Sequence, residues 1–250
     1  MNKIEILKSE KDGLKVKADI HRMAKEGWES ISEDDIQRLK WYGLFLRNPT
    51  PGFFMLRVRI PNGFSFSHQI RALCFIAETF GNGIIDITTR QQVQLRQLKI
   101  ENVPEVFDLL EEAGLTSTQT GLDNVRNIIG CPVAGLNPKE RVNPYAQVKA
   151  LTEHILNNSE FSNLPRKFNV AISGCANDCV HAETQDLALV PAVQEKGGNR
   201  VYGFNVLVGG KLGSGGYRIA TSLDVFVSPE EVVEVCSAII LLYRDHGSRE

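Results

Sequence analysis

Long apolar runs are missing from this sequence. No segment approaches the roughly 20 consecutive apolar residues that a helix needs to cross a bilayer. The first residues, Met1–Glu5, also lack the apolar core of a signal peptide. We therefore expect a cytoplasmic protein without a membrane span.

A strong charge of either sign is missing as well. Lys and Arg number 28 against 30 Asp and Glu, so the formal net charge is −2. Proteins that bind nucleic acids through the phosphate backbone carry strongly basic surfaces, so this balance argues against such a function. The 250 residues, 42% of them apolar, suffice for one large globular domain or two ordinary ones.

Cysteines are few and odd in number. Five of them fit poorly with a disulfide framework. Cys74 and Cys236 lie in helical apolar patterns, which indicates small buried side chains. Cys175 and Cys179 form a C-x3-C pair, and Cys131 could supply a third ligand, but metal and cluster sites usually need four.

What the sequence does contain is a set of cations on strand-like segments. Residues 54–60 and 167–172 each alternate apolar and polar positions, which predicts a strand with one buried face. The second face of these strands carries unusual side chains for a surface: Arg57, Arg59, Lys167 and Asn169.

Further cations stand in Thr88–Gln92 and Val125–Asn127. A single arginine on a strand is most often only a solvated surface residue. Guanidinium groups, however, bind carboxylates through two parallel hydrogen bonds, and an ammonium acts as a compact point charge. Taken together, these segments predict a cavity that holds a strongly anionic ligand.

The first part of the chain predicts an α+β module. Residues 1–47 are polar and favour short helices, with a cap indicated at Ser32 and Asp35, and Asn48–Gly52 marks a break. The following pattern predicts a sheet with helices on one face: strand 54–60, helix 67–80, strands 84–89 and 93–98, and helix 103–113.

A second region begins near Gln119. Its long loop at 127–143, rich in Gly, Pro and Asn, exceeds an ordinary connection and favours a functional role. The other expected elements are a helix at 144–156, strands at 167–172, 186–190 and 203–208, a Gly-rich turn at 209–216, and a closing helix at 229–243 with Ser228 as its N-cap.

Several short strings occur in a distinctive order between residues 40 and 250: Met55–Gly63, Thr88–Gln92, Gly114–Thr118, Asp123–Asn127, Leu164–Asn169, His181–Glu183, Asp186–Ala188 and Gly203–Gly210. In residue identity, order and spacing they resemble the first half of the sirohaem nitrite and sulfite reductases.

The resemblance implies a fold and an activity. A ferredoxin-like α/β module at 48–117 and a larger mixed α/β sirohaem-binding domain at 118–250 would follow an N-terminal helical segment at 1–47, as one of two pseudo-symmetric halves. Family members reduce nitrite to ammonium, or sulfite to sulfide, with six electrons at a sirohaem that is coupled to a [4Fe–4S] cluster. Ferredoxin is the implied donor, since no flavin domain is seen.

The anion-binding residues of the family map onto Arg57, Arg126, Lys167 and Asn169. Nitrite enzymes usually carry Asn at the last position, and sulfite enzymes a second Lys. Because sulfite is a dianion and nitrite a monoanion, Asn169 favours nitrite. By the same resemblance, the arginines would hold substrate oxygens and Lys167 would add charge and donate protons.

The many carboxylates of sirohaem would need further cations and amides. The residues expected to contact the cofactor are Arg59, Arg90, Gln92, Gln94, Arg96 and Arg166. The alternation of residues 92–96 places the two glutamines and Arg96 on one strand face.

The chain departs from the family in its cysteines, because the cluster ligands of the family lie in the second half. The chain is therefore interpreted as a fragment of a longer reductase or as a half-size protein that assembles with a complementary half. A third interpretation is a labile cluster on Cys131, Cys175 and Cys179. The competing functions are a sulfite reductase half and a non-catalytic tetrapyrrole-binding or assembly protein.

Overall fold

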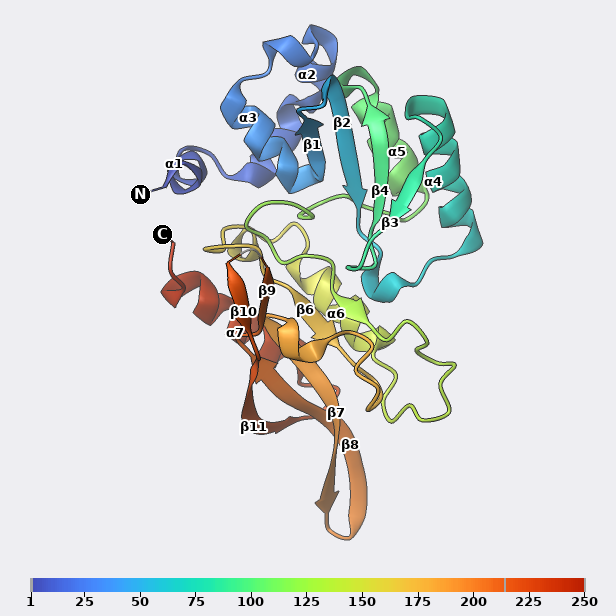
Figure 1. The fold of residues 1–250 in the computed structure, drawn as a ribbon, viewed down its shortest axis with the longest axis vertical. Helices are drawn as coiled ribbons and strands as arrows, with labels where there is room; N and C mark the ends of the chain where they lie inside the picture. The colour runs from blue at the N-terminus through green and yellow to red at the C-terminus, as the bar shows by residue number, and fades with distance from the viewer. Residues whose placement is uncertain (1, 214, 250) are drawn as a thin grey trace.

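Two β-sheets, each with its own hydrophobic core, organise the chain into two lobes (Figure 1). The computed structural model describes residues 2–213 and 215–249. The first lobe holds an antiparallel sheet of order β1-β2-β4-β3, and the second a mixed sheet of order β11-β8-β7-β6-β5. The mixed helix-and-sheet fold expected from the sequence is confirmed.

The first lobe follows the predicted pattern closely. Helix α5 buries Val103, Val106 and Leu110, which lie three and four residues apart, and it ends before Gly114, whose φ of 69° suits a glycine. The elements of this lobe are α1 (Lys3–Glu10), α2 (Ile20–Glu26), α3 (Glu33–Arg38), β1 (Leu44–Arg47), β2 (Thr50–Val58), α4 (Ser67–Phe80), β3 (Ile85–Ile87), β4 (Val93–Leu98) and α5 (Val103–Glu112).

Strand β1 is the main difference between the predicted and the observed elements of the first lobe. The predicted break at 48–52 is the turn of a β-hairpin, in which Leu44 of β1 pairs with Leu56 of β2. Leu44 is fully buried in the first core. The expectation of a purely helical segment up to residue 47 was therefore wrong for its last four residues.

The second lobe begins with three parallel strands. The central strand β6 covers only residues 170–172 of the predicted strand 167–172. Both of its faces are buried, Ala171 included, as is usual for parallel strands, so the expectation of one buried face was wrong here. The elements are β5 (Ile129–Gly130), α6 (Tyr145–Ile155), β6 (Val170–Ile172), β7 (Leu187–Lys196), β8 (Asn199–Val208), β9 (Lys211–Gly213), β10 (Gly216–Arg218), β11 (Thr221–Val227) and α7 (Val232–His246).

Two further predictions for the second lobe need correction. Strands β7 and β8 form a hairpin that extends well beyond the expected bounds and projects away from the lobe (Figure 1). Helix α7 begins at Val232, three residues later than expected, and Ser228 does not cap it. Instead, the main-chain N–H of Ser228 donates to the Glu231 carboxylate at 2.9 Å. The Gly-rich segment forms β9 and β10, and its Ser214 lies outside the described residues.

The two lobes meet along the segment between α5 and β5. Arg59 at the end of β2 pairs with Thr116, and Val125 pairs with Phe168 just before β6. The indole Nε1 of the buried Trp41 donates to Ser162 O across the junction, at 3.0 Å. Within the described chain, no helix is both long and apolar enough to span a membrane.

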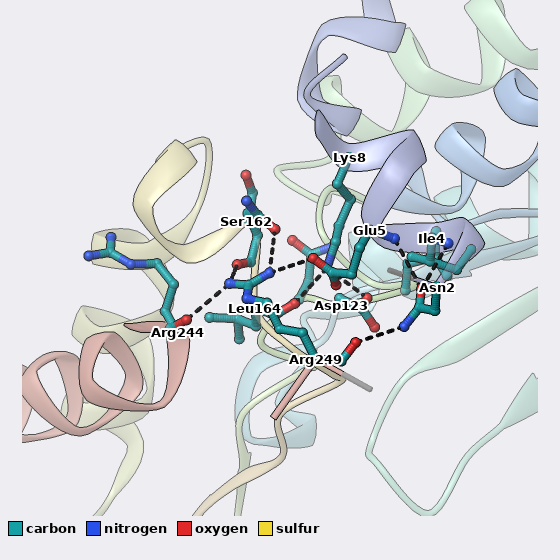
Figure 2. A network of polar contacts seen from close by, with 12 residues as sticks. Asn2, Ile4, Glu5, Lys8, Asp123, Ser162, Leu164, Arg244 and Arg249 are labelled. Atoms are coloured by element: carbon teal, nitrogen blue, oxygen red, sulfur yellow. Dashed lines mark hydrogen bonds and ion pairs between the residues drawn. The ribbon is translucent and has the colours of Figure 1, made fainter. Parts of the chain in front are cut away.

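Helix α1 also ties the lobes together (Figure 2). Lys8 Nζ donates to Asp123 Oδ2 at 3.1 Å and to Leu164 O at 2.9 Å, and it forms an ion pair with Glu5. Arg249 Nη1 donates to Glu5 Oε2 at 2.8 Å. We call Glu5, Lys8, Asp123 and Arg249 the terminal clasp, because they join the two ends of the described chain.

Candidate anion-binding site

Arg57 lies on the polar face of the first sheet, where that sheet meets the junction segment. In the register of the sheet it stands opposite Gln94 of β4, which in turn stands opposite Asp86 of β3. Its guanidinium lies over the Phe45 ring, and its Nη1 donates to Thr120 O at 3.2 Å. Strand β2 thus aims this arginine at the junction between the lobes.

Arg126 reaches the same carbonyl group from the junction segment. Its Nη1 donates to Thr120 O and its Nη2 to Leu122 O, both at 2.8 Å. The two guanidinium groups therefore converge on one oxygen. The Nε atoms of Arg57 and Arg126 are buried, and neither has a partner among the described residues. Buried donors without partners suit a site that binds an anion.

The electrostatics of this pair favour an anionic ligand as well. Burial and then the nearby cation Arg90 lower the pKa of Arg57 to about 10, and burial followed by Arg57 and Arg90 lowers the pKa of Arg126 to about 9. Charged groups that are kept from water and close to like charges are stabilised when an anion joins them.

A second set of side chains lies beside this pair. Arg90 Nε donates to Asn169 Oδ1 at 2.9 Å, and the Asn169 amide donates to the Asp186 carboxylate at 2.8 Å. Lys167 is accessible, and its pKa is lowered by partial desolvation and then by Arg90 and Arg126. The four residues predicted to bind the anion therefore come together, whereas the contact of Asn169 with Asp186 was not foreseen.

Two amides that sequence reasoning missed fix the loops of the site. Gln91 Nε2 donates to Gly130 O at 2.7 Å, and Gly130 N–H donates to Gln91 Oε1 at 3.0 Å. Asn127 Nδ2 donates to Ile60 O at 2.8 Å and to Arg90 O at 2.9 Å. Both amides lie in strings noted for their cations, but no local pattern indicates these long-range partners.

Arg59 has a different position from the one expected of a cofactor ligand. Only 1% of the residue is exposed. Its guanidinium donates to four main-chain carbonyl groups of the junction segment, those of Thr118, Gln119, Val125 and Arg126. Because its donors are occupied by main-chain oxygens, Arg59 shapes the segment that carries Arg126.

The remaining residues expected at the cofactor differ in exposure. Gln94 and Arg96 are half-buried and alternate with buried positions of β4, as predicted, and Arg96 Nε donates to Asp86 Oδ2. Gln92 precedes the strand and is buried, and its Nε2 has no partner in the described residues. Arg166 is exposed.

A cavity of about 340 Å³ adjoins the part of the site formed by Arg90 and Asn169. Cys179 and His181 line the same cavity. It offers cationic and amide donors in a partly enclosed space, which is the chemistry that a polycarboxylate ligand requires.

The three cysteines do not make a metal site. Among residues 2–213 and 215–249, no group of three or more His, Cys, Asp or Glu side chains could hold a metal ion. Burial raises the pKa of the Cys131 thiol, and the neighbouring Cys175 and Cys179 also raise it. The structure does not support the predicted ligand set, and it does not fit a [4Fe–4S] cluster, which needs four ligands.

The geometry defines a class of protein: two α/β lobes with a candidate anion-binding site at their junction. Comparison with known families then identifies the chain as a member of the nitrite and sulphite reductase family. The family described as "Nitrite and sulphite reductase 4Fe-4S domain" matches residues 121–250. The "Nitrite/Sulfite reductase ferredoxin-like half domain" matches residues 47–113. The predicted resemblance is confirmed.

Curated relatives and a solved structure agree with this membership. The chain is 49% identical over 253 residues to the ferredoxin–nitrite reductase of Leptolyngbya laminosa, covering 99% of this chain and 49% of the relative. Identity to the protein of that name from Synechococcus elongatus is 46% over 256 residues, covering 100% and 49%. The Mycobacterium tuberculosis NirA structure superposes with a TM-score of 0.91 at 30% identity, over 98% of this chain and 47% of NirA. The chain spans about half the length of these relatives.

Proposed function

We propose that this chain is the substrate- and sirohaem-binding first half of an assimilatory ferredoxin-dependent nitrite reductase. The complete enzyme would reduce nitrite to ammonium with six electrons from ferredoxin. One observation carries the proposal: beside Lys167, Arg57 and Arg126 converge on the Thr120 carbonyl, and neither Nε donor has a partner among the described residues. The relatives that are ferredoxin–nitrite reductases support nitrite as the anion.

Each residue of the site has a role that its position allows. The unpaired Nε donors of Arg57 and Arg126 would bind nitrite oxygens and stabilise the negative charge that develops on them. Lys167 is accessible and carries a lowered pKa, which suits a proton donor. Asn169 would hold Arg90 in place rather than bind the substrate alone.

The chain also fits sirohaem. The unpaired Gln92 Nε2 is a donor for the cofactor's carboxylates, and Arg90 and Arg166 are cations in the same region. When bound, sirohaem supplies the redox-active iron. The cluster ligands would come from a complementary half, because the cysteines of this chain do not form such a site. We therefore expect no turnover from this chain alone.

The test is an anaerobic absorption spectrum of the chain, produced in cells that make sirohaem, together with counts of iron and acid-labile sulfide. A sirohaem spectrum without sulfide would support the proposed half-site. Sulfide together with sirohaem would instead make Cys131, Cys175 and Cys179 ligands of a cluster. A chain that retains no sirohaem would overturn the proposal.

A further inference from the structure

Asp186 connects the anion-binding site to the central strands of the second lobe. Its Oδ2 accepts two hydrogen bonds from Asn169, one from the main-chain N–H and one from the side-chain Nδ2, both at 2.8 Å. The opposite end of the same amide, Oδ1, accepts from Arg90 Nε at 2.9 Å. Three side chains thus form a continuous link from β7 to the loop before β4.

The chemistry of the three groups makes this link directional. An ionised carboxylate only accepts hydrogen bonds, a guanidinium only donates them, and a side-chain amide does one at each end. Asp186 therefore selects the NH2 end of Asn169 and leaves the oxygen for Arg90. Without the carboxylate, the amide could turn over and present its NH2 group to Arg90, donor against donor, and that hydrogen bond would be lost.

The anchor of this link is rigid. Asp186 immediately precedes β7, where its main-chain oxygen accepts from Gly209 N–H at 2.9 Å. The next residue, Leu187, donates its N–H to the Asn169 carbonyl at 3.2 Å. Main-chain bonds therefore hold Asp186 and Asn169 in register, so the side-chain contact does not depend on a mobile loop.

Two cavities lie at the ends of the link. Arg90 and Asn169 line the cavity of about 340 Å³ at the anion-binding site. Asp186 lines a second cavity of about 430 Å³, together with Tyr243 and His246 of α7. Asp186 is not among the residues that line the first cavity, so its hydrogen-bonded path to that cavity runs through Asn169, while its charge also acts on Lys167.

We propose that Asp186 is a positioning residue of the anion-binding site, whose carboxylate fixes the orientation of the Asn169 amide and, through it, of the Arg90 guanidinium. The link itself belongs to this chain, whereas its effect on sirohaem rests on the proposed function. The two statements therefore need separate measurements.

The first measurement follows the side-chain signals of Asn169 and Arg90 by NMR in the 15N-labelled chain as the pH falls. Burial raises the pKa of Asp186, so both signals should shift together at a pH above the usual carboxyl range. Charges and titratable groups near Asp186 are Lys167 on the Asn169 segment and Tyr243 and His246 on α7. Asp186→Asn should abolish the joint shift.

The matched control is Asp108→Asn, because Asp108 is an exposed carboxylate on α5 of the first lobe, whereas Asp186 lies in the second lobe. It should leave the joint shift intact. Signals of Asn169 and Arg90 that titrate independently in the unaltered chain would overturn the proposal, and this result needs no variant, so it holds even where Asp186→Asn does not fold.

The second measurement is the sirohaem affinity of the chain by absorption titration. The hydrogen bond from the Arg90 guanidinium has a charged donor and is worth about 1.5–3 kcal/mol, so its loss predicts that Asp186→Asn weakens binding by up to roughly 10- to 150-fold. Asp108→Asn should have no effect. If Arg90→Met weakens binding and Asp186→Asn does not, the positioning role is wrong while the proposed function stands. If the unaltered chain binds no sirohaem, the proposed function fails, and the joint NMR shift alone decides whether Asp186 orients Asn169 and Arg90.

Discussion

Asn169 has a more constrained position than its place in the sequence indicates. Spacing puts it two residues after Lys167, with the buried Phe168 between them, but all three residues precede β6 and therefore do not form the predicted strand face. Both ends of the Asn169 amide, however, are engaged by Asp186 and Arg90. A role in choosing between nitrite and sulfite would therefore act through the placement of Arg90 as much as through direct contact.

This geometry sharpens a prediction for Asn169→Lys in a complete enzyme that contains this chain. The new ammonium group would face Asp186. Arg90 would lose Asn169 Oδ1 as its acceptor, so the site gains one cation and the Arg90 guanidinium becomes available to a ligand. We expect the ratio of kcat/KM for sulfite to kcat/KM for nitrite to rise. Asn169→Met is the matched control, since it removes the acceptor without adding charge. An unchanged sulfite-to-nitrite ratio in Asn169→Lys would contradict the assignment of nitrite as the preferred anion.

The lowered pKa values of Arg57 and Arg126 predict a pH limit for anion binding. Anions bind the protonated guanidinium groups, whose pKa values lie at about 10 and about 9, below their ordinary value. Affinity should be full near neutral pH and fall as the pH rises through about 9 and then about 10. Because a bound anion favours the charged forms, binding in this range should take up protons.

Calorimetric titration of the sirohaem-loaded chain with nitrite, in two buffers of different ionisation enthalpy, measures both effects. Proton uptake should be absent near neutral pH and appear above about pH 8, one unit below the lower of the two pKa values. An affinity that stays constant to about pH 10 would contradict the prediction.

At the scale of elements, periodicity located most of the helices and strands, but it did not predict the contacts of the polar side chains on them. The bounds of α4 and β4 match because each buries one regular set of side chains, such as Leu73, Ile76 and Ala77 in α4. Alternation placed Arg59 on the second face of the first strand, but Arg59 follows β2 and is buried. It could not show that main-chain oxygens some 60 residues away converge on that arginine, because such contacts leave no periodic signal.

The same limit applies to the candidate site. The resemblance located Arg57, Arg126 and Lys167, which the structure brings together. It did not indicate Asp186 as their neighbour, because a carboxylate at the start of a buried strand is ordinary in sequence. Only the register between the Asn169 segment and β7 reveals that contact.

Arg59 gives the prediction at this scale. Arg59→Met would leave four carbonyl oxygens of the junction segment without their donor, and each unsatisfied buried acceptor costs about 1–3 kcal/mol. We expect the free energy of unfolding to fall by about 3 kcal/mol or more in urea denaturation. Arg22→Met is the control, since Arg22 forms only surface ion pairs and should change stability by less than about 1 kcal/mol. Equal losses in the two variants would contradict the role of Arg59.

At the scale of the whole molecule, the anion-binding site depends on how the two lobes are held together. Arg57 comes from the first sheet, whereas Lys167 and Asn169 lead into the second. The terminal clasp acts on both of the segments that join them, because Lys8 bonds to Asp123, three residues before Arg126, and to Leu164, three residues before Lys167 (Figure 2). A helix at the start of the chain thus stabilises the segments that carry two of the proposed ligands.

Lys8→Met should therefore destabilise the whole chain. The Lys8 side chain is only 3% exposed, and its loss leaves the buried Asp123 carboxylate without its cation, which costs about 3–5 kcal/mol. Burial raises the pKa of Asp123 and Lys8 lowers it, so the variant should raise it further. An acid whose folded-state pKa is raised costs stability only while it is ionised. The deficit should be full at neutral pH and shrink as the pH falls through the raised pKa.

Urea denaturation at neutral and acidic pH measures the stability lost in Lys8→Met. Helix α1, which carries Lys8, also offers the control. Lys3 pairs with Glu33 on the surface, where the two side chains are 70% and 88% exposed, so Lys3→Met should cost less than about 1 kcal/mol at either pH. Adding Asp123→Leu to Lys8→Met removes the unpaired charge and should restore part of the lost stability. A double variant no more stable than Lys8→Met, or a deficit that does not shrink in acid, would mean that Lys8 stabilises the lobes by packing and not by balancing the charge of Asp123.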